Sequence, residues 1–438
     1  MRVTFIQPRI GIKPGVPYPT GWRMEPLWAA TLAALTPRSV DRDFFDDRFE
    51  AIPYGHETDL VAISVETYTA RRAYAIADRF RERDVPVVLG GFHVTLDPDE
   101  GAPHADAVVV GQAEPVWGPL LDDFTRGCLQ PRYASAVPRS WNSPQPDRSL
   151  YAARDYGPLR LVESSRGCPH ACEFCAVSAY YGQRYLARPI EAVVENIRRA
   201  ASRFVFIVDD NVGADTQRLR DLCEGLTPLR IRWMSQVGVQ VADDEGLLRA
   251  MRDSGCEGVL IGFESLNPAN LAAMHKPAAV HAGRYAEALH RLRRCGISVY
   301  GTFVFGYDAD TPASFDDALE FAVRERLFFA AFNHLLPFPG TPLYARLNAE
   351  GRLLHERWWL DPGYRYGDVA FRPAGFSAEQ LSASCNACRR RFYRWSSVAK
   401  RAELQANLST PFRAGTYFVQ NVVARRDVER RFGLLVGE

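Results

Sequence analysis

The sequence carries almost no net charge: it has 53 basic and 52 acidic side chains among 438 residues, which gives a formal charge of +1. Such a chain lacks the long-range field that attracts nucleic acid or an acidic membrane, so we expect neither as a partner. It also lacks an apolar run long enough to span a membrane, and its first residues lack the apolar stretch of a signal peptide. These absences predict a cytoplasmic protein.

The chain is too long for a single ordinary core, and its pattern divides it into four parts. Residues 1–125 alternate short apolar runs with helical stretches, which predicts a doubly wound, Rossmann-like α/β sheet. Residues 126–158 are rich in Pro, Ser, Arg and Asp and suggest a linker. Residues 159–341 repeat strand and helix six times, which predicts a partial (β/α)6 barrel with its chemistry at the C-terminal strand ends. We expect residues 342–438 to be mostly helical.

The apolar runs place the expected elements. The expected strands are 3–7, 40–45, 60–65, 85–89 and 107–110 in the first part, and 159–163, 204–208, 231–236, 258–263, 299–305 and 330–336 in the barrel. The expected helices are 26–35 and 70–83 in the first part, 190–201, 215–226, 243–254, 280–295 and 312–326 in the barrel, and 378–408 near the C-terminus.

Three of the nine cysteines, Cys168, Cys172 and Cys175, lie close together. In a large cytosolic chain such a group indicates metal ligands rather than disulfides. The run directly follows the first expected barrel strand, where a loop can wrap three thiolates around one corner of a cubic cluster. Three sulfurs suit a [4Fe-4S] cluster with one iron left open. A zinc site is the alternative, with His170 as the nearby candidate for a fourth ligand.

This C-x3-C-x2-C run, with an aromatic residue before its last cysteine and a six-unit barrel around it, resembles the radical S-adenosylmethionine (SAM) enzymes over residues 159–340. The resemblance implies that the three cysteines hold the cluster and that Phe174 packs near the adenine of SAM. It also implies that SAM chelates the open iron and is cleaved to methionine and a 5′-deoxyadenosyl radical. An electron donor such as a flavodoxin or ferredoxin would then be a partner.

The resemblance further implies SAM contacts at the ends of the later barrel strands. An acidic pair there would meet the methionine ammonium group, although one of its members could instead cap the next helix. The matching positions are Asp209 and Asp210 for the ammonium group, Ser235 and Gln236 for the carboxylate, Glu264 and Ser265 for the ribose, and Phe303 and Gly306 for the adenine.

Residues 1–125 resemble the cobalamin-binding-type domain found in one branch of this family, with Gly90 and Gly91 matching one of its turns. Many such domains carry Asp-x-His-x-x-Gly, whose histidine is the lower ligand of cobalt. The corresponding stretch here runs from Asp46 to Ala51 and has Arg48 in place of the histidine. A guanidinium stays protonated and cannot ligate cobalt. We therefore expect cobalamin to be absent.

Without cobalamin, the radical would drive an elimination or rearrangement on a small natural-product substrate. Our most specific hypothesis is the dehydration of an aminoglycoside sugar diol such as paromamine. Acidic residues at the barrel mouth would bind the aminosugar, and Glu66, Asp308 and Asp310 are the candidate catalytic residues. One alternative is a cobalamin-dependent radical SAM methyltransferase. The other is a non-catalytic iron-sulfur electron carrier or sensor.

Overall fold

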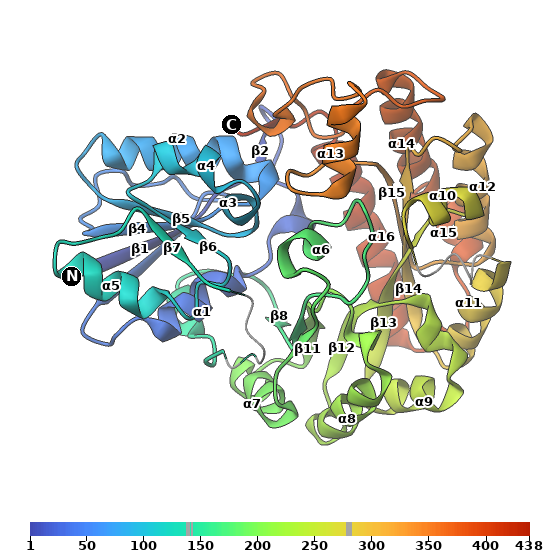
Figure 1. Ribbon diagram of the computed structural model, residues 1–438. Coiled ribbons are helices and arrows are strands. Elements are labelled where there is room, and N and C mark those ends of the chain that lie inside the picture. The colour runs from blue at the N-terminus through green and yellow to red at the C-terminus, as the bar shows by residue number, and fades with distance from the viewer. Residues whose placement is uncertain (137–140, 142, 277–282) are drawn as a thin grey trace.

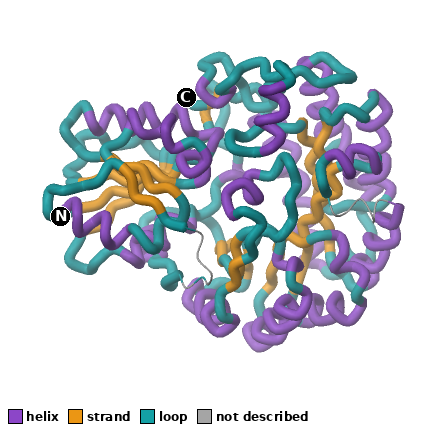
Figure 2. Tube along the Cα trace, viewed as in Figure 1, coloured by secondary structure: helices purple, strands orange, loops and turns teal. Residues whose placement is uncertain are grey.

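The computed structural model describes residues 1–136, 141, 143–276 and 283–438. Two separate parallel sheets form its two lobes, and helices from the C-terminal part of the chain pack beside the second (Figures 1 and 2). The α/β class and the order of the parts agree with the sequence analysis. Residues 137–140 and 142 of the expected linker, and the expected start of a helix at residues 280–282, lie outside the described residues.

The first sheet has six parallel strands in the order β3-β1-β4-β5-β6-β7. The chain passes from β1 to β3 on one side and then returns to β4 on the other side of β1. This reversal makes a switch point between β1 and β4, where ligands bind in doubly wound folds. The strands are β1 Arg2–Gln7, β3 Asp41–Asp46, β4 Leu60–Ser64, β5 Val87–Gly90, β6 Ala107–Val110 and β7 Arg132–Ala134.

Both faces of the first sheet are covered, which explains its nearly continuous apolar strands. Alternate residues of β4 point to opposite faces. Val61 and Ile63 pack with the helix α2 (Ala70–Arg81), whereas Leu60 and Ala62 pack with α1 (Leu27–Leu35) and α5 (Trp117–Thr125). The strand β7 lies within the expected linker, so that segment contributes to the first sheet.

The second sheet is a partial barrel of six parallel strands in the order β8-β11-β12-β13-β14-β15. Its edge strands β8 and β15 do not pair in the described part of the chain, so the barrel is open on one side. The strands are β8 Leu159–Val162, β11 Phe204–Ile207, β12 Arg232–Val237, β13 Cys256–Glu264, β14 Ser298–Phe305 and β15 Phe329–His334. The outer helices are α7 Ile190–Ala200, α8 Thr216–Leu226, α9 Glu245–Asp253, α11 Tyr285–Arg294 and α12 Pro312–Arg324.

The inner wall of the barrel can be read from the alternation of burial along β14. Val299, Phe303 and Phe305 are buried in one core with side chains of the outer helices. Tyr300 and Val304 therefore point to the opposite, inner side, where they are only partly buried. The strand β15 alternates in the same way.

The C-terminal part of the chain forms four helices: α13 Pro342–Ala349, α14 Ala378–Phe392, α15 Trp395–Arg401 and α16 Pro411–Arg431. The helix α16 lies within the mostly helical region expected for residues 342–438 but beyond the specific stretch 378–408. The fully buried Arg401 donates to the carbonyl oxygens of Leu327 and Phe328, which precede β15. At the end of the chain, β16 (Leu435–Val436) pairs with β2 (Gly11–Ile12), so the C-terminus returns to the first lobe.

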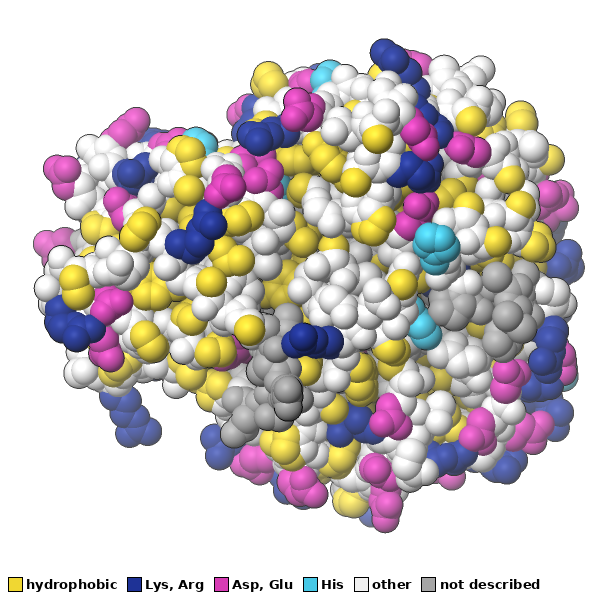
Figure 3. Space-filling model, in the orientation of Figure 1, with side chains coloured by type: hydrophobic (Ala, Val, Ile, Leu, Met, Phe, Trp, Pro, Cys, Tyr) yellow, Lys and Arg dark blue, Asp and Glu magenta, His cyan; other side chains and the backbone are white. Residues whose placement is uncertain are grey.

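The surface agrees with the balanced composition of the sequence. On the face shown in Figure 3, basic and acidic side chains are interspersed. No helix within the described ranges combines the length and apolarity needed to cross a membrane.

Candidate active site

The cysteine run forms a loop between β9 (Ser165–Arg166) and the short helix α6 (Ala176–Tyr181). Gly167 begins the loop with a φ of +77°, and a Cβ there would overlap the carbonyl oxygen of Arg184. Cys172 is buried, whereas Cys168 and Cys175 are partly accessible. Cys175 is the N-cap residue of α6. The local sequence thus brings all three thiols to the C-terminal edge of the barrel.

The polar residues that follow β11 hold this loop in place. Asp209 is buried and accepts hydrogen bonds from the Ser164 N–H at 2.7 Å and from the Ser165 hydroxyl at 2.6 Å. Asp210 accepts the Gly167 N–H at 2.7 Å. Both carboxylates, which the resemblance assigns to the SAM ammonium group, therefore have partners in the loop itself. Asn211, a residue that the predicted site does not include, places its amide nitrogen 3.9 Å from the Cys168 sulfur.

The three thiols lie within electrostatic range of one another. Burial is the largest cause that raises the pKa of Cys172, to about 11, and the neighbouring sulfurs raise it further, whereas Lys276 lowers it. Burial also raises the pKa of Cys168. Thiols in such a place become thiolates when a cationic cluster binds them. Among the described residues, no three His, Cys, Asp or Glu side chains lie close enough together to hold a single ion.

A buried ion pair lies beside the cysteine loop. Glu264 ends β13 in the left-handed region, at a φ of +61°, and accepts a bond from the Lys276 ammonium at 2.9 Å. The charge of Lys276 acts on Cys172 and Cys175 as well. Lys276 is absent from the predicted site, and its only signal in the sequence is that lysine is rare in this chain. Ser265 accepts the Asn267 N–H at 3.0 Å and so stabilises the turn after β13.

The remaining expected SAM contacts differ in the side that they face. Gln236 is partly buried on the inner side of β12, and its amide donates to the Asp210 carbonyl oxygen at 2.7 Å. Ser235 is buried on the outer side and donates to the Ile207 carbonyl oxygen at 2.7 Å. Phe303 points outward and stacks with Phe263, 5.7 Å between ring centroids. The side chains of Ser235 and Phe303 therefore do not line the inner wall of the barrel. This corrects the expectation that they contact SAM there.

Two other expected contacts pack against protein. Phe174 is partly buried against the barrel core. Gly306 adopts a φ of +115°, and a Cβ there would lie 2.9 Å from the side chains of Phe371 and Leu381. The C-terminal region, which supplies both of those side chains, therefore covers Gly306.

The two expected catalytic aspartates of the barrel, Asp308 and Asp310, are bound by other groups of the protein. Asp308 forms an ion pair with Arg352 at 2.8 Å, and its side chain is 58% exposed. Asp310 is buried, and its pKa is raised to about 6, mainly by burial. It accepts the Gly306 N–H and the Asn270 amide, both at 2.8 Å. We therefore assign Asp310 to holding the loop after β14, which corrects its expected role.

Glu66, the third expected catalytic residue, lines a cavity of about 260 Å³ that we call the junction cavity. The cavity lies at the C-terminal edge of the first sheet and reaches the cysteine loop. Gly91 keeps it open, because a Cβ there, at a φ of +98°, would lie 2.7 Å from the Ser64 hydroxyl. The lining includes Thr31, Leu32, Ser64, Glu66, Val88, Gly90, Gly91, Val109, Gly111 and Trp117 from the first lobe and Glu163, Arg166, Tyr180 and Tyr181 from the second.

Arg166 joins the two sides of the junction cavity. It lies two residues before Cys168 and forms ion pairs with Glu163 at 2.9 Å and with Glu114 of the first lobe at 2.6 Å. Its guanidinium also lies over the Trp141 ring, 4.3 Å from the centroid. The position of the cysteine loop is thereby tied to the first lobe.

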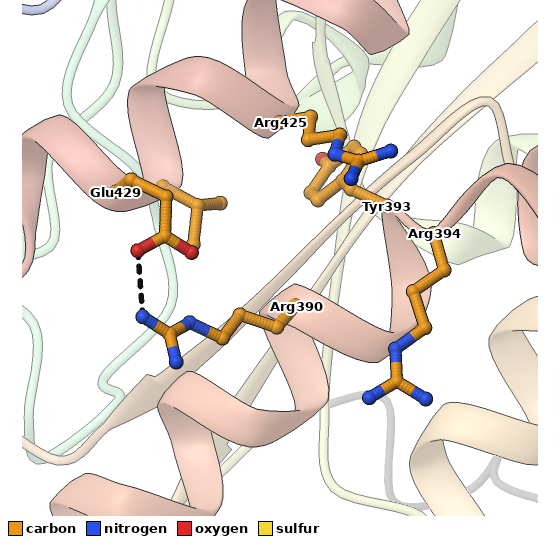
Figure 4. Close-up of a pocket in the computed structure, with 6 residues that line it drawn as sticks. Arg390, Tyr393, Arg394, Arg425 and Glu429 are labelled. Atoms are coloured by element: carbon orange, nitrogen blue, oxygen red, sulfur yellow. Dashed lines mark hydrogen bonds and ion pairs between the residues drawn. The ribbon is translucent and has the colours of Figure 1, made fainter.

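A second cavity, of about 350 Å³, lies between α14 and α16 (Figure 4). Its lining includes Arg390, Arg394 and Arg425, and Arg390 pairs with Glu429 at 2.6 Å. No residue of the expected site lines it.

Comparison with known families matches both lobes. The Radical SAM superfamily model matches residues 162–322, and the B12 binding domain model matches residues 21–117. Bacteriochlorophyllide d C-12(1)-methyltransferase of Chlorobaculum tepidum is 30% identical over 392 residues, which cover 86% of this chain and 84% of that protein. The chain belongs to the radical SAM superfamily, in the branch with a B12-binding domain.

Other relatives of this radical SAM enzyme agree with that placement. Hopanoid C-2 methylase of Rhodopseudomonas palustris is 26% identical over 87% of this chain and 73% of its own. The radical SAM enzyme OxsB, solved with aqua-cobalamin, has the same fold, with a TM-score of 0.68, 14% identity and coverage of 97% and 72%. The methyltransferase TsrM from Kitasatospora setae, solved with cobalamin and a [4Fe-4S] cluster, has a TM-score of 0.64 and is 17% identical. The match covers 89% of this chain and 81% of that chain.

The match to the B12 binding domain overturns the expectation that cobalamin is absent. That expectation depended on Arg48, which follows the edge strand β3. In the structure Arg48 pairs with Asp46 at 2.6 Å and donates to the carbonyl oxygens of Trp22 and Met24. It therefore stabilises the loop after β3. Arg48 is not among the residues that line the junction cavity, although its charge acts on Glu66 there.

The residues present fit both cofactors. Cys168, Cys172 and Cys175 provide three thiols for a [4Fe-4S] cluster, with one iron free for SAM. The junction cavity offers an apolar slot of Leu32, Val88, Val109 and Trp117, with the polar Ser64, which suits the planar aromatic base of cobalamin.

Proposed function

We propose that the protein is a cobalamin-dependent radical SAM methyltransferase that acts on a small molecule. The observation that carries this proposal is the shared space between the lobes. The junction cavity starts at the switch point of the B12-binding domain and is bordered by Arg166, two residues before Cys168. Two relatives that match this chain over most of their own length also support it, because their names describe them as a methyltransferase and a methylase.

When bound, the cluster with SAM supplies a hydrogen-abstracting radical, and cobalamin supplies the methyl group. The chain contributes positions and exclusion of water. Arg166 holds the cysteine loop against the first lobe, and Phe92 stacks on Tyr180 at 4.5 Å between ring centroids, which closes the same junction. An electron donor such as a flavodoxin or ferredoxin remains part of this proposal.

We infer a substrate with a large apolar surface. The inward-facing residues of the barrel strands include Phe206, Met234, Tyr300 and Phe329, and Met234 is 42% exposed. Met234 is the exposed one of these four, and an exposed apolar side chain on a concave wall favours an apolar ligand. The named substrates of the relatives, a bacteriochlorophyllide and a hopanoid, have this character.

Dehydration of an aminosugar has less support. No relative named above is a dehydratase, and both barrel aspartates that would hold an amine have protein partners. An electron carrier or sensor has less support still, because the relatives named above are enzymes.

The first test is reconstitution with iron, sulfide and hydroxocobalamin under anaerobic conditions, followed by desalting. We expect about one equivalent of corrin to remain with the cluster, since a domain that encloses a ligand retains it through desalting. The visible spectrum and cobalt analysis measure it. A cluster spectrum without corrin would contradict methyl transfer.

Lys276→Met tests the ion pair beside the cysteines. We expect the Kd for SAM to rise about 10-fold to 100-fold, because a charged hydrogen bond contributes about 1.5–3 kcal/mol and the SAM carboxylate would lose this cation. Equilibrium dialysis with labelled SAM measures the change, with iron content as the control for cluster loss. The variant Lys276→Arg should recover part of the affinity. Unchanged binding in Lys276→Met would remove Lys276 from the SAM site.

A further inference from the structure

The first lobe offers no unpaired histidine, among its described residues, that could lie beneath the cobalt of a bound cobalamin. Among the described residues of that lobe, each histidine is engaged with a carboxylate. His56 lies 2.8 Å from Asp43, and His104 lies 2.9 Å from Asp78. His93 is fully buried, 2.8 Å from Glu100. None of the three lines the junction cavity.

Glu66 occupies the position at which a ligand would be expected. It lies two residues after the end of β4, at the switch point. Its side chain is accessible within the junction cavity. The Thr69 hydroxyl accepts the Glu66 N–H and donates to its carbonyl oxygen, both at 3.0 Å, which fixes the backbone at this point. The carboxyl group is therefore carried by a rigid turn and not by a flexible loop.

Glu66 also differs from the other acidic residues of the cavity. Glu114 and Glu163 both form ion pairs with Arg166. Within the described ranges, no Arg, Lys or His forms an ion pair with Glu66. The surrounding protein raises the pKa of Glu66, and the more distant Arg48 only partly opposes this. Glu66 is thus an accessible carboxyl group in the cavity without an ion-pair partner among the described residues, and such a group suits a cationic ligand.

We propose that Glu66, and not a histidine, is the side chain that this protein presents to the lower face of the cobalt. The proposal rests on the proposed function, since it requires cobalamin in the junction cavity. The corrin face turned towards the first lobe lies over the C-terminal edge of its sheet, and Glu66 is the acidic residue at the centre of that edge. The cobalt then meets a carboxyl oxygen or a water that this oxygen holds.

The test is the electron paramagnetic resonance spectrum of the cobalt(II) form bound to the reconstituted protein. The unpaired electron of this form points along the axis to the lower ligand, so a nitrogen there splits each cobalt line into a triplet and an oxygen does not. We expect no nitrogen splitting with cobalamin. We also expect the same spectrum with cobinamide, which lacks the nucleotide base.

Two substitutions locate the position. Glu66→His should introduce the nitrogen triplet with both corrins, and the triplet should become a doublet when the protein is labelled with ¹⁵N-histidine. Gln112→His places an imidazole elsewhere in the same cavity and should leave the spectrum unchanged. Because Glu66 has no ion pair to lose, its replacement should not disturb folding.

The outcomes separate this proposal from the function beneath it. A triplet in the unsubstituted protein overturns the role of Glu66 while leaving methyl transfer intact. If that triplet disappears with cobinamide, the base of cobalamin is the ligand, and if it persists, a histidine is. A Glu66→His protein that binds cobalamin without splitting also overturns the proposal. Failure to retain either corrin overturns the proposed function itself.

Discussion

Replacing Cys172 by alanine is expected to abolish formation of 5′-deoxyadenosine. Cys172 is the buried thiol of the three, and its loss leaves one iron of the expected cluster without its thiolate. Substitutions that only disturb a supporting partner of a metal ligand cost about 10-fold to 100-fold. Loss of the ligand itself should exceed that range. Chromatographic detection of 5′-deoxyadenosine after reduction measures the change.

Cys223→Ala provides the matched control for this prediction. Cys223 is also buried, but it lies on α8 and packs in the core against the barrel, away from the cysteine loop. Its replacement should retain the full iron and sulfide content and the full yield of 5′-deoxyadenosine. A Cys172→Ala protein with a complete cluster would show that the ligand set includes a different residue.

Replacing Arg166 by methionine is expected to lower the free energy of unfolding by about 3 kcal/mol. The reason is that Glu114 and Glu163 would keep their charges at the junction without the cation that pairs with both. Breaking a buried ion pair on one side leaves such uncompensated charge, which costs more than the pair contributes. Thermal or chemical denaturation of the apoprotein measures the effect.

The double variant Arg166→Met with Glu114→Gln should recover part of this loss, since one of the two stranded charges is then removed. The surface pair of Arg199 and Glu195 gives the scale for comparison. Both side chains are exposed, so Arg199→Met should change the stability by less than about 1 kcal/mol. Equal effects of the two arginine variants would show that the junction pair is no more important than a surface contact.

The alternation of apolar and helical segments predicts most of this fold. Each expected strand of both sheets is present with ends that differ by at most two residues, because parallel strands buried on both faces have a clear apolar character. The same character hides which way each residue points. Phe303 and Val304 are both apolar, and only the structure shows that Phe303 faces the outer helices. The strand β7 is too short to give a pattern.

Spacing alone predicts the three cysteines as cluster ligands, whereas no spacing predicts the groups around them. Glu264 and Lys276 are twelve residues apart, and no local pattern indicates that they meet. Asp209 and Asp210 do lie at the expected strand end, yet their oxygens bind the backbone and hydroxyls of the cysteine loop. Sequence position fixes the end of a strand but not the partner that a carboxylate finds there.

The wrong prediction about cobalamin has a similar origin. It used one motif position, Arg48, as a test for the whole domain. Arg48 follows β3 at the edge of the sheet, and the cavity lies at the switch point between β1 and β4. A strand order cannot be read from the chain order of the strands, so the sequence alone could not show that Arg48 does not line the cavity.

The contacts of Glu173, between the second and third cysteines, determine when the cluster can be built. Its carboxylate pairs with Arg346 of α13 at 2.8 Å, and its carbonyl oxygen accepts the Leu343 N–H at 3.0 Å. Its own N–H donates to Met274. The last contacts of this loop therefore come from α13, with Arg346 lying 173 residues further along the chain. We expect metal delivery to be complete only after the barrel has been synthesised, because a nascent chain that stalls within it lacks these contacts around its three thiols.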